Sequence, residues 1–364
     1  MRVGVLGAGQ LGRMLALAGY PLGLKFQFLD PAAGSPAGQI APQTVADYDD
    51  PAALAGLETC DVVTFEFENV PDQAADRLAA ATRVYPPPAA LRVSQDRLVE
   101  KRCLASLNIA TPRFEPVHDE ASLRQAIDRL GLPCVLKTRR FGYDGKGQCV
   151  LSHGSDLPGA LALVGQGPLI LEEFVAFDRE LSIVAVRAQD GSVASYPLIE
   201  NRHEDGILRR STVPSDTQPA VEREAAASVQ RLLEHLNYVG VLTVEFFEVA
   251  GRLLANEFAP RVHNSGHLTI EAARTSQFEN HLRAITGLPL GATDCPAPAA
   301  MLNLIGTLPD KTAVLRVAGT HYHDYGKEVR PGRKVGHITI TANTRGELEA
   351  RVAEVSALLH PSSR

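Results

Sequence analysis

Two acidic residues on neighbouring predicted strands are the strongest candidates for chemistry in this 364-residue sequence. Residues 243–258 consist of two apolar runs separated by a Gly-Arg pair, a pattern that predicts two strands joined by a tight turn. Each run carries one acid, Glu245 or Glu257, and Asn256 lies beside the second. Two carboxylates and an amide oxygen suit a hard divalent cation such as Mg²⁺, which usually binds together with phosphates. The alternative is an edge hairpin that turns both acids to solvent.

A glycine-rich basic loop, TRRFGYDGKGQ at residues 138–148, follows a predicted strand at 134–137. Its three closely spaced glycines let the backbone approach a ligand, and Lys137 and Lys146 supply positive charge for phosphates. The loop matches neither the Walker A pattern nor the dinucleotide pattern GxGxxG. A purely structural hairpin would not need so much charge, so phosphate binding is the interpretation that we favour.

Polar side chains that could surround the ribose and the base of a nucleotide lie at the ends of two further predicted strands. Glu172 and Glu173 lie where the strand at 169–174 meets a loop, and Glu180 begins the next strand. Such acids can accept hydrogen bonds from ribose hydroxyl groups while apolar neighbours enclose the base. His203, in the sequence ENRHEDG, is either a turn residue or part of the same cleft.

The N-terminal segment contains a GxGxxG motif, GAGQLG at residues 7–12, between a predicted strand and a predicted helix. Asp30 follows at about the distance of the acid in a dinucleotide site, where the helix N-terminus binds a phosphate. The same glycines would also serve a turn that lets strand and helix pack closely. Glu68 follows another predicted strand, at 61–65, where ligands bind in parallel α/β sheets.

The composition limits the class of protein. A chain of 364 residues exceeds what one hydrophobic core usually supports, which predicts two or three domains. A net charge of -6 argues against a general nucleic-acid-binding protein, and no apolar run is long enough to span a bilayer. The first residues already read as a strand, so we expect no signal peptide. Five cysteines without CxxC spacing indicate reduced thiols in a cytosolic protein and no zinc site.

The hydrophobic pattern predicts the elements that position these residues. Strands at 3–6, 26–29 and 61–65 indicate a Rossmann-like α/β domain, and residues 89–108 read as one amphipathic helix. Near the C-terminus, a capping box opens a helix with one apolar face, formed by Leu348, Val352, Val355 and Leu359. The basic, glycine-broken segment 321–334 before it indicates, by itself, a solvated hairpin.

Six motifs in a fixed order resemble one enzyme family. They are GAGQLGRM, FEFENV, QDR, RRFGYDGKGQ, EFAPRVHNSGH and YGKEVRPGRKVGH. Together they are similar to the 5-(carboxyamino)imidazole ribonucleotide synthases of purine biosynthesis, within the ATP-grasp superfamily. The resemblance implies a mixed α/β and α+β ATP-grasp architecture. Its expected parts are a Rossmann-like domain at 1–96, an ATP-grasp region at 97–290 with a mobile lid at about 112–176, and a small C-terminal domain at 291–364.

The resemblance also implies the reaction. Members of this family use ATP and Mg²⁺, with up to two metal ions, to phosphorylate bicarbonate. The resulting carboxyphosphate, or CO₂ released from it, carboxylates the exocyclic amine of 5-aminoimidazole ribonucleotide and leaves ADP and phosphate. The implied protein is an ATP-dependent carbon–nitrogen ligase, cytoplasmic and homodimeric, with no nucleic-acid or membrane partner.

Matching positions imply roles for individual residues. The implied ATP-binding residues are Arg97, Lys137, Gly142, Tyr143, Asp144, Gly145, Lys146, Gly147, Gln148, Glu172, Glu173, Phe174, Val175, Glu180, His203, Asn256 and Glu257. Glu245 and Glu257 would hold the metal. The implied substrate-binding residues are Gln10, Leu11, Glu68, Tyr143, Asp144, Arg261, His263, Asn264, Ser265, Lys327, Arg333 and Lys334. Among them the candidate catalytic residues are Asp144, Arg261, His263 and Lys327.

Asp144 is the residue that we expect to orient or deprotonate the amine, because it lies beside Tyr143 in an otherwise basic loop. Asp144→Asn is expected to retain ATP binding and to lose carboxylation. Unchanged turnover of this variant would remove Asp144 from the mechanism.

Three alternatives remain open on the sequence alone. An NAD-linked oxidoreductase rests only on residues 7–12 and Asp30, and the resemblance assigns this glycine loop to the substrate phosphate instead. A sister ATP-grasp ligase, such as a formate-dependent glycinamide ribonucleotide transformylase or a biotin-carboxylase-like protein, would share the fold. A regulatory nucleotide-binding protein without catalysis fits least, because metal-binding acids, a lid loop and oxyanion-binding groups are all present.

Overall fold

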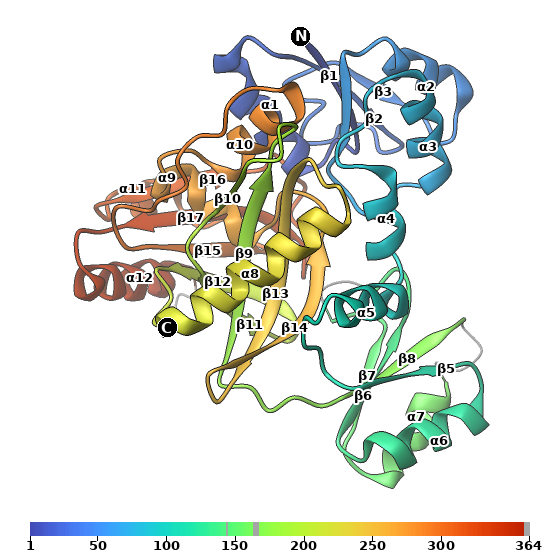
Figure 1. The fold of residues 1–364 in the computed structure, drawn as a ribbon. Coiled ribbons are helices and arrows are strands. Elements are labelled where there is room, and N and C mark those ends of the chain that lie inside the picture. The colour runs from blue at the N-terminus through green and yellow to red at the C-terminus, as the bar shows by residue number, and fades with distance from the viewer. Residues whose placement is uncertain (143–144, 163–166, 360–364) are drawn as a thin grey trace.

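The computed structural model describes residues 1–142, 145–162 and 167–359, and the strands in these ranges form three sheets (Figure 1). The sheets follow one another along the chain: a parallel N-terminal sheet, a small antiparallel sheet and a large antiparallel sheet. Within the same ranges, no helix is both long and apolar enough to cross a lipid bilayer.

The N-terminal sheet has the strand order β3-β2-β1-β4, and all neighbouring strands are parallel. Its strands are β1 (Arg2–Leu6), β2 (Lys25–Asp30), β3 (Gln43–Val45) and β4 (Val62–Phe65), and its helices are α1 (Gln10–Gly19), α2 (Pro51–Glu58) and α3 (Asp72–Ala81). The apolar run of β1 is buried throughout, as a parallel strand between helices requires. The three predicted strands of the Rossmann-like domain are therefore confirmed.

Two short helices, α4 (Pro88–Ser94) and α5 (Arg97–Ser106), connect this sheet to the next one. The prediction of a single helix over 89–108 is wrong, because Asp96 leaves the helical conformation and caps α5. Its carboxylate accepts hydrogen bonds from the N–H groups of Leu98 and Val99, at 3.0 and 3.4 Å. The apolar periodicity continues across this break and conceals it. The break places Arg97 in the first turn of α5.

The small antiparallel sheet has the strand order β5-β8-β6-β7. Its strands are β5 (Phe114–Val117), β6 (Cys134–Thr138), β7 (Gln148–Leu151) and β8 (Leu169–Glu173), covered by α6 (Glu120–Leu130) and α7 (Leu157–Leu161). This unit has its own buried core, which includes Val117, Leu136 and Leu171, and it projects from the rest of the molecule (Figure 1). A separate core suits a lid, since such a unit can move without opening the larger cores. The mobility and the limits of the lid remain predictions.

The large sheet contains nine strands in the order β14-β13-β9-β11-β12-β15-β17-β16, with β10 paired to β9. The strands are β9 (Arg179–Arg187), β10 (Val193–Ser195), β11 (Ile199–Glu204), β12 (Ile207–Val213), β13 (Gly240–Val249), β14 (Arg252–Ala259), β15 (Ala299–Ile305), β16 (Thr320–Asp324) and β17 (Lys334–Thr341). The remaining helices are α8 (Pro219–His235), α9 (Thr269–Ala272), α10 (Gln277–Thr286), α11 (Lys311–Leu315) and α12 (Arg345–Leu359). The predicted hairpin is β13 and β14, joined by a turn at residues 250–251.

The C-terminal segment continues the large sheet. β12 pairs antiparallel with β15 in a register that runs from Arg210 opposite Leu302 to Val213 opposite Ala299. The predicted apolar face of α12 packs against β15 and β17, with Leu348, Val352 and Val355 buried and Leu359 partly buried. Because of this continuity, the loop at residues 325–333, called the basic loop below, is anchored to the same sheet as Glu245 and Glu257.

The third glycine of the GxGxxG motif allows close packing of helix on strand. A Cβ atom on Gly12 would lie 2.9 Å from Cε1 of Phe28 in β2, which is closer than van der Waals contact allows. We expect Gly12→Ala to lower the free energy of unfolding by about 1–3 kcal/mol, since overpacking a core costs this much. The control is Gly346→Ala in α12, where a Cβ would meet no atom within 4 Å. Equal denaturant midpoints for the two variants would contradict the packing role of Gly12.

Candidate active site

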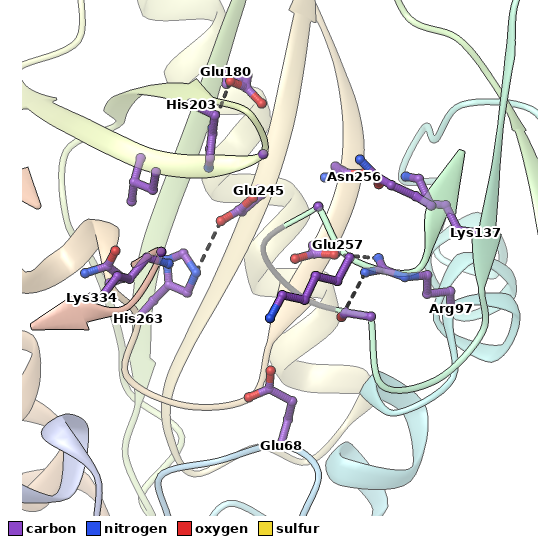
Figure 2. A pocket seen from close by; sticks show the side chains of 18 of the residues that line it. Glu68, Arg97, Lys137, Glu180, His203, Glu245, Asn256, Glu257, His263 and Lys334 are labelled. Atoms are coloured by element: carbon purple, nitrogen blue, oxygen red, sulfur yellow. Dashed lines mark hydrogen bonds and ion pairs between the residues drawn. The ribbon is translucent and has the colours of Figure 1, made fainter. Parts of the chain in front are cut away.

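A cleft of about 980 Å³ lies between the N-terminal sheet, the small sheet and the large sheet (Figure 2). Most of the predicted site residues line it, although they come from distant parts of the chain. They are Gln10, Leu11, Glu68, Arg97, Lys137, Gly142, Gly145, Lys146, Gln148, Glu172, Glu173, Phe174, Val175, Glu180, His203, Glu245, Asn256, Glu257, Arg261, His263, Asn264, Lys327, Arg333 and Lys334.

Four predicted residues are exceptions. Tyr143 and Asp144 lie outside the described residues. Gly147 is not among the lining residues and packs against Thr138 instead. Ser265 is fully buried behind His263, so it does not reach the cleft directly.

A β-bulge brings the predicted metal-binding residues to the cleft. Glu245 pairs with Glu257 across β13 and β14, but the next pair is Phe246 with Ala255, so Asn256 has no partner position on β13. In a regular strand, consecutive side chains point to opposite faces. The bulge redirects the chain, and both Asn256 and Glu257 line the cleft beside Glu245 (Figure 2).

The two acids differ in their electrostatic surroundings. Burial and the neighbouring Glu257 raise the pKa of Glu245 to about 7. Burial alone would also raise the pKa of Glu257, but Arg97 outweighs it and lowers this pKa to about 2. The Nη1 atom of Arg97 lies 2.6 Å from Oε2 of Glu257 (Figure 2). The guanidinium of Arg97 therefore stabilises Glu257 as a carboxylate, whereas a negative charge on Glu245 is less well compensated.

A second cationic group lies on the small sheet. Lys137 of β6 places Nζ 2.9 Å from Oε2 of Glu172 in β8, and Lys101 of α5 approaches the same oxygen at 3.4 Å from behind. Burial would raise the pKa of Glu172, but the two lysines outweigh it and lower this pKa to about 2. Lys101 is fully buried and does not line the cleft, so its charge acts on the site through Glu172.

Another part of the cleft has the features of a nucleoside pocket. Nδ1 of His203 lies 2.8 Å from Oε2 of Glu180, and this pairing raises the pKa of His203 although burial alone would lower it. The rings of Phe177 and Phe247 lie near them along the cleft and stack with centroids 4.9 Å apart. Sequence analysis missed both rings. Phe247 lies two residues after Glu245 on the same strand face, and this spacing was a signal that could have revealed it.

His263 is held from its backbone and from its ring. The side-chain amide of Gln277 accepts a hydrogen bond from the His263 N–H at 2.9 Å and donates one to its carbonyl oxygen at 2.6 Å. Nε2 of the ring lies 3.2 Å from Oε1 of Glu245 (Figure 2). Burial, together with the nearby charges of Arg261 and Lys334, lowers the pKa of His263 to about 3. The imidazole is therefore neutral near pH 7.

Arg261 links the large sheet to the N-terminal domain. Its Nε atom donates a hydrogen bond to Oε2 of Glu68, and both residues line the cleft. Burial alone would raise the pKa of Glu68, but Arg261 outweighs burial and lowers it. The acid predicted at the carboxyl end of β4 and the arginine predicted beside His263 are thus brought together.

Backbone N–H groups of the N-terminal glycine loop already have carboxyl acceptors within the protein. Glu66 accepts hydrogen bonds from the backbone N–H groups of Gly9 and Gly12, and Asp30 accepts one from the Ala8 N–H at 2.8 Å. These acids occupy positions that a dinucleotide pyrophosphate and ribose would need. The NAD interpretation is therefore disfavoured by the geometry. Sequence analysis did not single out Glu66, although it belongs to the quoted motif FEFENV.

The basic loop forms the wall opposite the glycine loop. Lys327, Arg330 and Arg333 line the cleft, as does Lys334 at the start of β17. Nε2 of Gln39 donates a hydrogen bond of 2.8 Å to the Gly326 carbonyl oxygen, which ties the loop to the N-terminal domain. The segment is thus one wall of the cleft, as the resemblance implied.

Three sequence families match the chain in succession. They are the ribonucleotide synthetase preATP-grasp domain at residues 1–95, the ATP-grasp domain at 102–278 and the phosphoribosylaminoimidazole carboxylase C-terminal domain at 299–351. The N5-carboxyaminoimidazole ribonucleotide synthase of Pseudomonas aeruginosa is 52% identical over 360 residues, covering 99% of each chain. The chain belongs to the N5-carboxyaminoimidazole ribonucleotide synthase family. The predicted ATP-grasp fold and the predicted class, an ATP-grasp ligase, are thereby confirmed.

Solved structures of N5-carboxyaminoimidazole ribonucleotide synthases agree with this assignment. The crystal structure of the synthetase from Thermus thermophilus matches with a TM-score of 0.95 and 51% identity, covering 100% of this chain and 99% of that one. An Aspergillus clavatus synthase in complex with ADP and 5-aminoimidazole ribonucleotide matches with a TM-score of 0.91 and 33% identity, covering 98% of each chain. The formate-using sister ligase is not favoured by these relatives.

The contact between Glu66 and the glycine loop can be tested by a substitution of equal shape. In Glu66→Gln, the amide oxygen can accept from only one of the Gly9 and Gly12 N–H groups, and the amide nitrogen opposes the other. An unsatisfied buried donor costs about 1–3 kcal/mol, and we expect denaturant unfolding to show a loss of this size. Glu58→Gln, which removes only a surface ion pair with Arg77, is the control and should change stability by less than about 0.5 kcal/mol. Losses of equal size in both variants would contradict this role of Glu66.

Proposed function

We propose that this protein uses ATP and bicarbonate to carboxylate the exocyclic amine of 5-aminoimidazole ribonucleotide, giving 5-(carboxyamino)imidazole ribonucleotide, ADP and phosphate. The proposal rests mainly on one observation. A single cleft contains two separate clusters of cationic and N–H groups that could bind anions, one for each phosphorylated substrate. One cluster contains Arg97 and Lys137, and the other contains the basic loop and the N-terminus of α1. Glu245 and His263 lie within the same cleft. Family membership supports both substrates.

ATP is proposed to bind along β6, β8 and the β13–β14 hairpin. Arg97 and Lys137 would contact the phosphates, together with the described lid residues Gly142, Gly145, Lys146 and Gln148. Glu180 and His203 would contact the ribose, with Phe177 and Phe247 beside the base. A guanidinium and an ammonium that now neutralise protein carboxylates would neutralise phosphate oxygens instead. This exchange would leave neither acid without a partner, because Glu257 would bind the proposed metal and Glu172 also pairs with Lys101.

The residues present fit Mg²⁺. Oδ1 of Asn256 is buried and has no hydrogen-bond partner among the described residues, which suits an oxygen ligand whose cation is bound with the nucleotide. Glu245 and Glu257 would supply two carboxylate ligands to the same cation. The described residues include no group of three or more His, Cys, Asp and Glu side chains arranged for a metal. Mg²⁺ commonly takes its other ligands from phosphates and water, and it would neutralise charge on the transferred phosphoryl group.

The ribonucleotide is proposed to bind between the glycine loop and the basic loop. Glu66 uses the Gly9 and Gly12 N–H groups, which leaves the first two helical residues of α1, Gln10 and Leu11, to face a phosphate. Lys327, Arg333 and Lys334 would approach this phosphate from the opposite wall. Arg261 and Glu68 line the same cleft as Glu245, and the amine and the bicarbonate carbon are proposed to meet beside them. Arg261 can bind an oxyanion through two N–H groups.

Two further expectations concern the protein in solution. The resemblance implies a homodimer in the cytoplasm. All five cysteines are free thiols, which is consistent with a reducing compartment. Sedimentation of the purified protein at micromolar concentration should give twice the 39.0 kDa chain mass, and a monomer would reject the dimer.

The proposed reaction predicts phosphate release that depends on three components. With Mg-ATP and bicarbonate, adding 5-aminoimidazole ribonucleotide should raise phosphate release and consume the free aromatic amine in equal amounts. Replacing bicarbonate with formate, or the ribonucleotide with glycinamide ribonucleotide, should give background release only. Phosphate release that is indifferent to the ribonucleotide would reject the proposed substrate and leave the ATP-grasp fold unaffected.

The two anion-binding clusters predict opposite kinetic effects for two lysines. Lys327→Ala should raise the KM for the ribonucleotide about tenfold or more, because a charged hydrogen bond is worth about 1.5–3 kcal/mol, and should change the KM for ATP much less. Lys137→Met should do the reverse. Equal rises of both constants in either variant would indicate general damage to the fold and contradict the assignment of the two clusters.

A further inference from the structure

A chain of buried hydrogen bonds leads from strand β12 to His263 in the cleft. Oγ of Ser211 donates to Oδ1 of Asn201 at 2.7 Å, and Nδ2 of Asn201 donates to Oγ of Ser182 at 2.9 Å. Oγ of Ser182 donates to Oγ of Ser265 at 2.8 Å. Oγ of Ser265 lies 2.9 Å from Nδ1 of His263. The first four residues are at most 6% exposed, so water does not compete for these bonds.

Groups that can only donate a hydrogen bond fix the donor and acceptor roles along this series of hydrogen bonds. The backbone N–H of Ser265 can only donate, and it lies 3.3 Å from Nδ1 of His263, so Nδ1 must offer its lone pair. The Ser265 hydroxyl accepts from Ser182, so its own proton is directed to Nδ1. With two donors directed at Nδ1, the proton of the ring lies on Nε2, which is 3.2 Å from Oε1 of Glu245.

We infer that Ser182, Asn201 and Ser265 are positioning residues that hold His263 in the Nε2–H tautomer, as a neutral hydrogen-bond donor toward the oxyanions of the reaction. The inference rests on the proposed function for its catalytic consequence, but the tautomer itself rests on hydrogen bonds alone. It narrows the role of His263, which sequence analysis left simply as catalytic. With Nδ1 occupied by two donors and Nε2 already protonated, His263 cannot take a proton from the amine.

The advantage of the Nε2–H tautomer follows from a comparison with the Nδ1–H tautomer. An Nδ1–H imidazole would turn the Nε2 lone pair toward Glu245 and toward any bicarbonate-derived oxygen beside it, which is repulsive. A preorganised neutral donor stabilises developing negative charge and needs no rearrangement during the reaction. Asn201 sets the polarity of the chain from a distance, because an amide NH₂ group can only donate to Ser182.

Asn201→Asp tests the inference, because it places an acceptor where Asn201 now donates and changes the shape very little. Ser182 would then donate to residue 201, and Ser265 would have to donate to Ser182, which removes the hydroxyl donor from Nδ1. The matched control is Asn280→Asp in α10. Asn280 is fully buried and bonds to Tyr196 and Gly291, outside the cleft. Ser182→Ala provides a second variant that breaks the same chain if Asn201→Asp does not fold.

The primary measurement is the ¹⁵N imidazole spectrum of the full-length protein labelled at histidine, with the His263 signals identified by their loss in His263→Gln. The wild type and Asn280→Asp should show protonated Nε2 and unprotonated Nδ1 at pH 7. Asn201→Asp or Ser182→Ala leaves the Ser265 N–H as the remaining donor directed at Nδ1, so these variants should show a mixture that contains a measurable share of the Nδ1–H tautomer. The same two variants should lower kcat about tenfold or more, with the KM for ATP changed less than about twofold.

Three outcomes would overturn the inference. They are an Nδ1–H or charged imidazole in the wild type, a wild-type tautomer together with wild-type kcat in Asn201→Asp and Ser182→Ala, and an equal loss of kcat in Asn280→Asp. The spectrum does not require turnover. If the wild type releases no phosphate in response to the ribonucleotide, the proposed function fails, while the tautomer is still decided by the spectrum.

Discussion

The ion pair between Arg97 and Glu257 is the interaction on which the arrangement of the cleft depends. A charge removed from water needs a partner, and here the partners belong to the connecting helix α5 and the hairpin strand β14. Two local irregularities make the contact: Asp96 ends one helix and caps the next, and the bulge at Asn256 turns Glu257 into the cleft. Asp96 also pairs with Arg139 at 2.6 Å, so the same break fixes the start of the glycine-rich lid loop. Removing either irregularity would separate Arg97 from Glu257.

The same principle applies at both ends of the cleft. Glu172 is neutralised by Lys101 and Lys137, Glu68 by Arg261, and the glycine loop by Glu66. Protein carboxylates are therefore in contact with the groups that are proposed to receive phosphates. Binding then exchanges one set of partners for another and does not create isolated charges, which would be costly in a partly buried cleft.

Much of this structure could be predicted from the sequence, because short motifs and periodic strands are local properties. The parallel strands and the hairpin were found in this way, and most of the cleft residues were identified through the resemblance of six motifs to one family. The features that were missed depend on tertiary contacts. A helical period cannot show that Asp96 interrupts it, alternation cannot show a bulge at Asn256, and the position of Ser265 beneath His263 depends on a strand more than eighty residues earlier in the sequence, β9. Glu66 was missed because an acid that follows a strand is usually interpreted as a substrate-binding residue. Here its carboxyl group accepts hydrogen bonds from the protein backbone instead.

The hydrogen bond from Gln39 to Gly326 joins positions 287 residues apart. It ties the basic loop, near the C-terminus, to the N-terminal domain. During synthesis, the parallel sheet, the lid and the hairpin emerge from the ribosome before the basic loop does. A nascent chain thus already contains Arg97, Lys137, Glu245 and Glu257 while one wall of the cleft is still missing. A nucleotide held by such a chain would be exposed to water on that side. The cleft therefore cannot be completed before the basic loop is synthesised, and a chain that ends before this loop lacks both that wall and strand β17 of the large sheet.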